Sequence, residues 1–341
     1  MDLPDLEAEA RAKLDTTFYD YIAGGAEDEQ TLADNEAAWA RMRLRPRVLR
    51  DVRTIDTSTE ILGVKVSSPV GIAPMAMQHR ASPEGPVATA RAASATDSLF
   101  VMSLFGAGSA RDVAAAPGDA PRWLQVYVME DRERSVEAIA RSAEQGYSAI
   151  VITVDVARQG NRRRDARNRW TFLQSDGSIE DPNDLFDHAL TFDDIAWLCE
   201  RTPIPLVVKG LSRGDDARAC VEAGAAGVIV SNHGGRQLDG AVSTADVLGE
   251  VVESIEGRAE VYVDGGIRRG QHVVKALALG ARAVFVGRPV MWGLVVAGQK
   301  GVEGVLRGFQ DEVERAMALC GVRGVDEIDA SLLAPARAVP W

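Results

Sequence analysis

The stretch AAGVIVSNHGGRQLDG, residues 225–240, joins an apolar run to a group of polar residues. The run at its start is typical of a strand that is buried on both faces. It ends on His233, two glycines and Arg236 instead of an ordinary turn. Because parallel strands of α/β proteins present functional residues at their carboxyl ends, this ending indicates a functional site.

Seven other short apolar runs resemble this strand. Together with residues 226–234 they are residues 69–73, 98–103, 123–128, 149–155, 205–210, 260–266 and 283–289. Segments of helical period separate them, such as RERSVEAIARSAEQG (132–146) and RGQHVVKALALGA (269–281). Strands that alternate with helices in this way predict an α/β fold, a closed (β/α)8 TIM barrel, with a doubly wound open sheet as the alternative.

Residues 1–68 do not fit this repeat. Residues 5–25 and 28–42 are expected to form two helices joined at a pair of glycines, followed by an extended region, and to cap the barrel. Residues 158–190 lack a period and predict an active-site loop after the fourth strand. We expect residues 1–341 to form a single domain, because α/β barrels commonly reach this length.

Composition restricts the class of protein. The net charge of −12 opposes binding to nucleic acid or to an anionic membrane. The three cysteines, Cys199, Cys220 and Cys320, form no C-x-x-C pair, which favours reduced thiols and a cytoplasmic location. The acidic N-terminus lacks the pattern of a secretion signal, and the apolar stretch 283–298 is interrupted by an arginine and a proline, so no membrane span is expected.

Polar residues also lie at the ends of the other predicted strands. They are Ser103, Gln125, Tyr127, Thr153, Asp155, Lys209, Asp264 and Arg288. If the barrel closes, these side chains converge at one end of it. A lone histidine is more often structural than catalytic, but His233 belongs to this group and is therefore a candidate base. The remaining histidines, His79, His188 and His272, are expected to be packing or surface residues.

Arginines in two motifs indicate a carboxylate ligand. Arg236 follows His233 by three residues, and Arg162 opens the run NRRRDARNR. Two guanidinium groups could bind a planar carboxylate from both sides, because each matches it bidentately. The alternative for Arg162, Arg163 and Arg164 is a solvated charged loop, and at most one or two of the three need point inward.

Glycine-rich turns after the last two strands indicate a phosphate. VDGGIRRG (263–270) and FVGRP (285–289) place backbone amides, Arg268 and Arg288 where barrels commonly bind a phosphate. Lys209 in such a site would stabilise developing negative charge. The sequence has no metal-binding motif and no G-x-G-x-x-G of the dinucleotide-binding type.

At these motifs the chain resembles the FMN-dependent 2-hydroxy acid oxidase and dehydrogenase family, which includes glycolate, lactate and mandelate-oxidising enzymes. The resemblance spans nearly the whole chain through YDYIAGGAEDEQTLADN, GIAPMAM, LQVYV, NRRRDARNR, SNHGGRQLDG and VDGGIRRG. It implies bound FMN and the oxidation of a small L- or S-2-hydroxy acid to the 2-oxo acid. It also implies molecular oxygen or another electron acceptor as partner, and a homo-oligomer, expected to be a tetramer.

The resemblance also implies a role for individual residues. His233 would be the base that takes a proton from the substrate, and Asp155 would orient it. Lys209 and Tyr127 complete the expected catalytic set. The substrate would be bound by Tyr21, Tyr127, Arg162, Arg236, Phe105 and Gln159. FMN would be bound by Ala73, Pro74, Met75, Ala76, Ser103, Gln125, Thr153, Lys209, Ser231, Asp264, Gly266, Arg268, Gly287 and Arg288.

Departures from the family pattern bear on the substrate. The loop after the fourth strand is shortened, Phe105 stands where some members have tryptophan, and Gln159 where an aliphatic residue is common. The stretch GRPVMWGLVVAGQKGV (287–302) is similar to hydroxymandelate oxidases and favours an aromatic substrate of the mandelate type, with glycolate and lactate as alternatives. Ala76 favours oxygen as acceptor over a dehydrogenase that uses another one.

Two other hypotheses remain open at this point. An FMN barrel of the isopentenyl diphosphate isomerase type would use the phosphate site but has no need for His233, Arg236 and Arg162 together. A flavin-binding or phosphate-binding barrel without catalysis would have no need for the base or for Lys209, and fold alone does not establish function.

Overall fold

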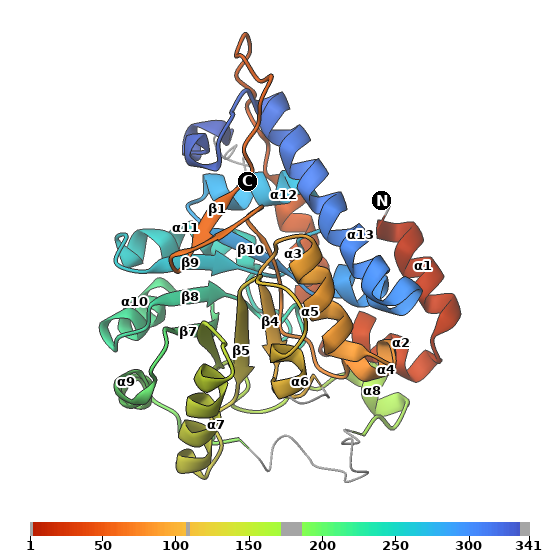
Figure 1. Ribbon diagram of the computed structural model, residues 1–341, viewed down its shortest axis with the longest axis vertical. Coiled ribbons are helices and arrows are strands. Elements are labelled where there is room, and N and C mark those ends of the chain that lie inside the picture. Colours follow the sequence, from red (N-terminus) through yellow and green to blue (C-terminus); the bar gives the residue numbers. More distant parts are fainter. Residues whose placement is uncertain (1–2, 107–109, 172–185, 335–341) are drawn as a thin grey trace.

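Eight parallel strands form a closed barrel at the centre of the computed structural model, which describes residues 3–106, 110–171 and 186–334 (Figure 1). The strands are β3 (Val70–Ile72), β4 (Phe100–Ser103), β5 (Arg122–Val126), β6 (Ala149–Thr153), β7 (Leu206–Leu211), β8 (Gly227–Val230), β9 (Glu260–Val263) and β10 (Ala283–Val286). Pairing of β10 with β3 closes the barrel. The predicted TIM barrel is confirmed, and the alternative of a doubly wound open sheet is wrong.

The strands are mostly apolar because both of their faces are covered. Every residue of β6 and of β8 is buried. Inside the barrel, the rings of Trp123, Tyr262 and Phe285 pack against one another with centroids 5.5–5.9 Å apart. The interior of the barrel is therefore a packed core, and a ligand of this fold is expected beyond the strand ends.

Helices surround the barrel and connect its strands (Figure 1). They are α4 (Gln78–Ala81), α5 (Gly85–Ala95), α6 (Ala110–Ala114), α7 (Arg132–Glu144), α8 (Arg163–Arg167), α9 (Phe192–Arg201), α10 (Gly214–Glu222), α11 (Thr244–Ile255), α12 (Gly270–Ala278) and α13 (Arg288–Cys320). The last helix is kinked at Ala297 and Gly298, and two 3-10 turns follow it, Val325–Glu327 and Ala330–Leu332. Among the described residues, no helix is long and apolar enough to cross a membrane.

The N-terminal region contains three helices and a hairpin: α1 (Leu3–Lys13), α2 (Thr16–Ala23), α3 (Gln30–Arg41), β1 (Thr59–Ile61) and β2 (Val64–Val66). The prediction of two helices is wrong, because Asp15 ends the first one early. Its side chain accepts a hydrogen bond of 2.8 Å from the Phe18 N–H and so starts a new helix. Helix α1 packs against α13, and α2 packs against α8. Because α8 follows β6, this contact places α2 near the carboxyl ends of the barrel strands.

Candidate active site

A pocket lies at the carboxyl ends of the barrel strands, and nearly all the residues predicted for the site line it. They are Tyr21, Ala73, Pro74, Met75, Ala76, Ser103, Phe105, Gln125, Tyr127, Thr153, Gln159, Arg162, Lys209, His233, Arg236, Asp264, Gly266, Arg268, Gly287 and Arg288. The two remaining residues, Asp155 and Ser231, are not in the lining but form hydrogen bonds to His233 and Lys209, respectively. The barrel therefore assembles the predicted set in one place.

A sharp turn after β8 carries His233 into the pocket. His233, Gly234 and Gly235 all have positive φ angles, of 58°, 63° and 76°. A Cβ atom on Gly235 would lie 2.6 Å from the backbone nitrogen of Leu32 in α3, so only glycine fits there. The carbonyl of Gly235 in turn accepts a hydrogen bond of 2.8 Å from the Ala26 N–H. The HGG motif thus joins the barrel to the N-terminal helices.

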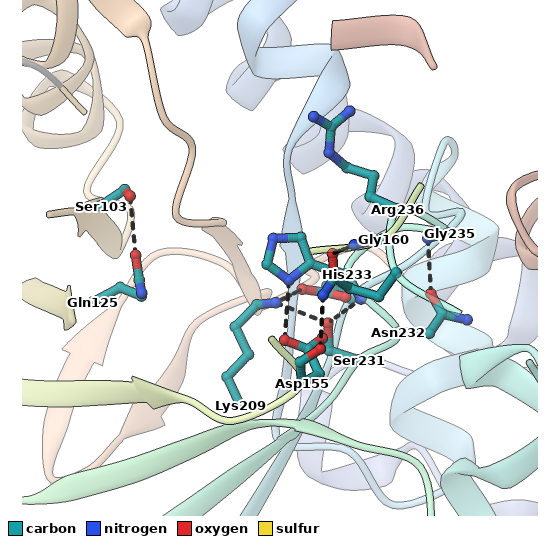
Figure 2. Close-up of polar contacts among 12 residues, drawn as sticks. Ser103, Gln125, Asp155, Gly160, Lys209, Ser231, Asn232, His233, Gly235 and Arg236 are labelled. Atoms are coloured by element: carbon teal, nitrogen blue, oxygen red, sulfur yellow. Dashed lines mark hydrogen bonds and ion pairs between the residues drawn. The ribbon is translucent and has the colours of Figure 1, made fainter. Parts of the chain in front are cut away.

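His233 and Asp155 form a partly buried pair just after the ends of β8 and β6. The Nδ1 atom of His233 lies 3.0 Å from Oδ1 of Asp155 (Figure 2). Burial raises the pKa of Asp155, but the attraction of His233 and Lys209 outweighs burial and leaves this pKa below its ordinary value. An ionised carboxylate only accepts hydrogen bonds, so Nδ1 carries the hydrogen and Nε2 is the basic nitrogen.

The state of the imidazole follows from the same surroundings. Burial lowers the pKa of His233 below its ordinary value, and nearby Lys209 lowers it further, although Asp155 opposes this shift. His233 is therefore neutral at neutral pH. A neutral imidazole with a carboxylate behind it can accept a proton and be stabilised once it has done so.

Arg162 and Arg236 bring two positive charges together in the pocket. Arg236 donates through Nη1 to the backbone oxygen of Tyr21 at 2.6 Å, and its guanidinium lies 4.8 Å from the centre of the Tyr21 ring. Arg162 is almost fully buried, and its ion pair with Asp165 is long, at 3.9 Å. Burial and the charge of Arg236 lower the pKa of Arg162 to about 10. An anionic ligand between the two guanidinium groups would offset this repulsion.

The two arginines that follow Arg162, Arg163 and Arg164, pair with acidic residues of the N-terminal region. Arg163 pairs with Glu27 at 2.9 Å and also with Asp28. Arg164 pairs with Glu29 at 2.5 Å. These residues attach the segment after β6 to the N-terminal helices, whereas Arg162 alone of the three lines the pocket. One member of the three therefore reaches the pocket, and the other two are ion-paired, with Arg163 the more exposed of them.

Lys209 is held by side chains from two neighbouring strands. Its ammonium donates to Oγ of Ser231 at 2.9 Å and lies 3.4 Å from Oδ2 of Asp264. The Oδ1 atom of Asp264 and the Nε2 atom of Gln125 are buried and have no hydrogen-bond partner in the described part of the chain. Ser103 fixes the orientation of Gln125 by donating to its Oε1 at 2.9 Å. Unpaired polar atoms in a pocket indicate a polar ligand, since buried groups of this kind are almost always satisfied.

The far end of the pocket is basic and rich in glycine. A Cβ atom on Gly266 would lie 2.1 Å from the backbone oxygen of Asn35, so the turn packs directly against α3. Arg268 pairs with Glu36 at 2.8 Å. Arg288 donates to the carbonyls of Ile22, Gly234 and Gly24 at 2.9–3.1 Å, so much of its guanidinium binds the protein itself. Burial, together with Arg236 and Arg268, lowers the pKa of Arg288 to about 9, which makes an anion favourable at this end.

Sequence analysis missed Phe186, which forms part of the pocket wall. Its ring stacks on Tyr127 with centroids 4.3 Å apart and lies 5.8 Å from Phe105. Phe186 forms an isolated bridge with Met129, and the N–H of Asp187 donates to Val128 at 3.0 Å. The predicted loop 158–190 thus contains helix α8 and this anchored end, while its residues 172–185 lie outside the described residues.

The pocket has further lining residues that sequence analysis did not name. They are Ile22, Val156, Gly234, Gly265, Ile267, Phe285, Val286 and Met291. His79 and His272 are not among the lining residues, and His272 stacks on Trp39 at 6.3 Å with its pKa lowered to about 4 by burial. No group of three or more metal-binding side chains occurs within the described ranges.

Comparison with known proteins identifies relatives over nearly the whole chain. The family model of FMN-dependent dehydrogenases matches residues 10–335. The mouse protein 2-hydroxyacid oxidase 1 is 44% identical over 353 residues, which cover 97% of this chain and 95% of the mouse protein. Spinach glycolate oxidase is 45% identical over 349 residues, with 97% and 94% covered. A solved structure of a mandelate oxidase with benzoyl-formic acid is 41% identical, with a TM-score of 0.91 and coverage of 98% and 97%.

The pocket itself fits FMN. Its unpaired atoms, Gln125 Nε2 and Asp264 Oδ1, offer a donor and an acceptor to a polar ring system and its side chain. The glycine turn at Gly266 and the basic group of Arg268 and Arg288 offer amides and positive charge to a phosphate. The chain therefore belongs to the FMN-dependent dehydrogenase family, among its 2-hydroxy acid oxidases, and it is an oxidoreductase that acts on a CH–OH group with FMN as its cofactor.

Proposed function

We propose that this enzyme oxidises an aromatic 2-hydroxy acid of the mandelate type to the 2-oxo acid and passes the electrons to molecular oxygen. The proposal rests on one observation, namely that two pairs of side chains lie at the same pocket. The His233 and Asp155 pair supplies a base, and the Arg162 and Arg236 pair supplies a carboxylate site. A 2-hydroxy acid is the ligand class that requires both.

The carboxylate is bound by the two arginines and by tyrosine hydroxyl groups. Burial raises the pKa of Tyr127, and the nearby Asp155 raises it further, so its hydroxyl stays protonated and can donate a hydrogen bond. Tyr21 lines the same part of the pocket beside Arg236. Binding through two guanidinium groups and two hydroxyls would fix the orientation of the reacting carbon, which is the main requirement for catalysis by proximity.

His233 acts as the base at Nε2. It accepts a proton from the substrate while Asp155 stabilises the imidazolium across the 3.0 Å hydrogen bond. FMN supplies the acceptor of the two electrons that the substrate loses. Lys209, held by Ser231 and Asp264, would stabilise negative charge on the cofactor.

The proposed cofactor contacts follow from the lining of the pocket. Ser103, Gln125 and Thr153 would bind the polar edges of the ring, with the backbone of residues 73–76 beside it. Asp264 would bind the sugar-alcohol chain through its unpaired Oδ1. The phosphate would be held by Gly266, Arg268, Gly287 and Arg288.

The aromatic wall supports a mandelate-type substrate. Phe105, Tyr127 and Phe186 form a cluster of rings beside the carboxylate site, with Gln159 and Val156 in the same lining. Aromatic rings prefer offset-stacked or edge-to-face partners at these separations. The proposal is also supported by the similarity of this chain to solved mandelate oxidase structures, which are 40–41% identical and two of which contain benzoyl-formic acid.

Oxygen as acceptor is supported by the relatives and by one pocket residue. The mouse and spinach relatives are named oxidases. Ala76, which resembles the residue of the oxidases at this position, lines the pocket.

Oxygen consumption by the FMN-loaded enzyme tests the proposal. The panel is glycolate, L-lactate and both enantiomers of mandelate, and the control is His233→Ala. We expect the largest kcat/KM with one mandelate enantiomer and loss of turnover in the variant. Turnover of glycolate or lactate alone would refute the aromatic preference, and reduction of a dye without oxygen consumption would refute the acceptor.

A further inference from the structure

Trp170 packs against the pocket residue Tyr21 from outside the pocket. It follows α8 in the segment after β6, and its ring stacks on Tyr21 with centroids 4.3 Å apart and planes 13° apart. Phe18, one turn earlier on α2, lies 5.9 Å from the same indole. Trp170 is half-buried and does not line the pocket. It therefore contacts the site only through another residue.

Arg80 covers the outer side of this aromatic group. Its guanidinium, from α4, lies 4.7 Å from the Trp170 ring and 4.8 Å from the Phe18 ring. Asp15, the residue that caps α2, holds Arg80 at 3.2 Å. Two segments that are distant from Trp170 in sequence, α2 and α4, thus fix the position of the indole. Arginine over an indole is the strongest form of this cation–π contact.

The contacts continue from Trp170 into the pocket. The Tyr21 ring that stacks on Trp170 also lies 4.8 Å from the guanidinium of Arg236. Arg236 additionally donates to the Tyr21 carbonyl at 2.6 Å. Arg80, Trp170, Tyr21 and Arg236 therefore form one continuous series of contacts, from an exposed arginine to a pocket arginine.

We propose that Trp170 is a positioning residue, which holds the Tyr21 ring against Arg236 and thereby sets the affinity of the site for the substrate carboxylate. The inference rests on the proposed function, in which Tyr21 and Arg236 bind that carboxylate. Without the indole, the phenol ring can change its side-chain torsions and leave the guanidinium. Small displacements of binding groups are costly when several must act on one planar ligand.

The role is separable from folding, because other contacts attach the same segment. Asn168 donates to Asp20 of α2 at 2.8 Å, and Arg164 pairs with Glu29 at 2.5 Å. These hydrogen bonds and ion pairs remain when Trp170 is replaced. A loss of carboxylate affinity would then report on Tyr21 and Arg236 and not on detachment of the segment.

The test compares Trp170→Leu and Trp170→Phe with a matched control, Trp197→Leu. Trp197 lies on α9, is also half-buried, and has Arg201 at 4.8 Å over its ring, but it does not line the pocket or contact Tyr21. The measurement is the Kd of benzoylformate, a carboxylate that cannot be oxidised at C2, from the change in the FMN absorption spectrum. Loss of one aromatic contact predicts about 2- to 10-fold weaker binding in Trp170→Leu. Trp170→Phe and Trp197→Leu should stay within about 2-fold of the parent.

A second pair of variants, and separate measurement of KM and of the rate of FMN reduction, distinguish a failure of this proposal from a failure of the proposed function. Arg80→Gln should weaken benzoylformate binding about 3- to 5-fold, because it loses the cation–π contact with Trp170, and Arg201→Gln is its control. The KM for the hydroxy acid should rise in parallel with the Kd, while the rate of FMN reduction at saturation changes less. If the parent oxidises 2-hydroxy acids but the Kd of benzoylformate is unchanged in Trp170→Leu, the role of Trp170 is wrong and the proposed function stands. Arg80→Gln gives the same test if Trp170→Leu does not fold. A parent that binds no carboxylate and oxidises no hydroxy acid overturns both proposals.

Discussion

Replacement of Asp155 by asparagine isolates what the carboxylate does for His233. The substitution keeps the size of the side chain and removes the negative charge 3.0 Å from Nδ1. Because that charge stabilises the imidazolium formed when His233 takes a proton, its loss should raise the barrier. A hydrogen bond to a charged group contributes about 1.5–3 kcal/mol, which corresponds to a decrease in kcat of about 10- to 150-fold.

The pH profile of the same variant has a predicted sign. In the parent, kcat/KM should fall as the pH drops through the pKa of His233, which burial places below its ordinary value of 6.5. Asp155 is the group that raises this pKa. Without its charge, the pKa of His233 falls further, so the acidic limb should move to lower pH while the plateau decreases.

The assay is anaerobic stopped-flow reduction of FMN by the preferred hydroxy acid over a range of pH. Asp215→Asn is the control, because Asp215 pairs with Arg213 on the surface. A plateau rate in Asp155→Asn within about 2-fold of the parent would refute the assigned hydrogen-bond contribution. An acidic limb displaced to higher pH would refute the reasoning about the charge.

Three further substitutions test other parts of the site. Arg162→Leu should raise the KM by about 30-fold or more, as expected when one partner of a charge pair is truncated. The unfolding temperature should stay equal or rise, because burial and Arg236 lower the pKa of Arg162 to about 10 and make its charge unfavourable in the fold. A lower KM, or a clearly lower unfolding temperature, would contradict this. Phe186→Leu should raise the KM for mandelate about 2- to 10-fold and leave the KM for glycolate unchanged, since only an aromatic substrate loses a ring contact. Equal effects on the two KM values would exclude a role of Phe186 in selecting aromatic substrates. Gly266→Ala should reduce the FMN content of the purified protein, because the added Cβ would lie 2.1 Å from the backbone oxygen of Asn35. The control Gly257→Ala, with a similar φ of 72° but open space around it, should retain the cofactor. Equal losses of FMN in the two variants would attribute the effect to backbone strain alone.

The barrel and its functional end could be predicted because the relevant signals are local. A parallel strand covered on both faces is a continuous apolar run, and all eight runs correspond to barrel strands. Polar residues at the ends of those runs, such as Lys209 and His233, then had to meet once the barrel closed. The division of the first helical segment is also encoded locally, since Asp15 is a favourable N-cap residue for a second helix.

The remaining features depend on contacts between distant segments. Phe186 enters the pocket because a bridge to Met129 places it there, and its own sequence surroundings have no period. Trp170 is distinguished only by Tyr21 and Arg80, which belong to other segments. Likewise, Arg288 donates to carbonyls of Ile22 and Gly24, so its hydrogen bonds depend on how the N-terminal helices pack on the barrel. Periodicity and motifs carry no information on such contacts.

The most direct test of the central claim is an anaerobic titration of the FMN-loaded enzyme with each mandelate enantiomer, followed through the visible absorption of the oxidised cofactor. One enantiomer should bleach the absorption at a stoichiometry of about one per FMN, and His233→Ala should remain coloured under the same conditions. If the parent stays oxidised with both enantiomers and with glycolate and lactate, the assignment of a 2-hydroxy acid to this pocket is wrong. If His233→Ala is reduced as fast as the parent, the assignment of the base is wrong.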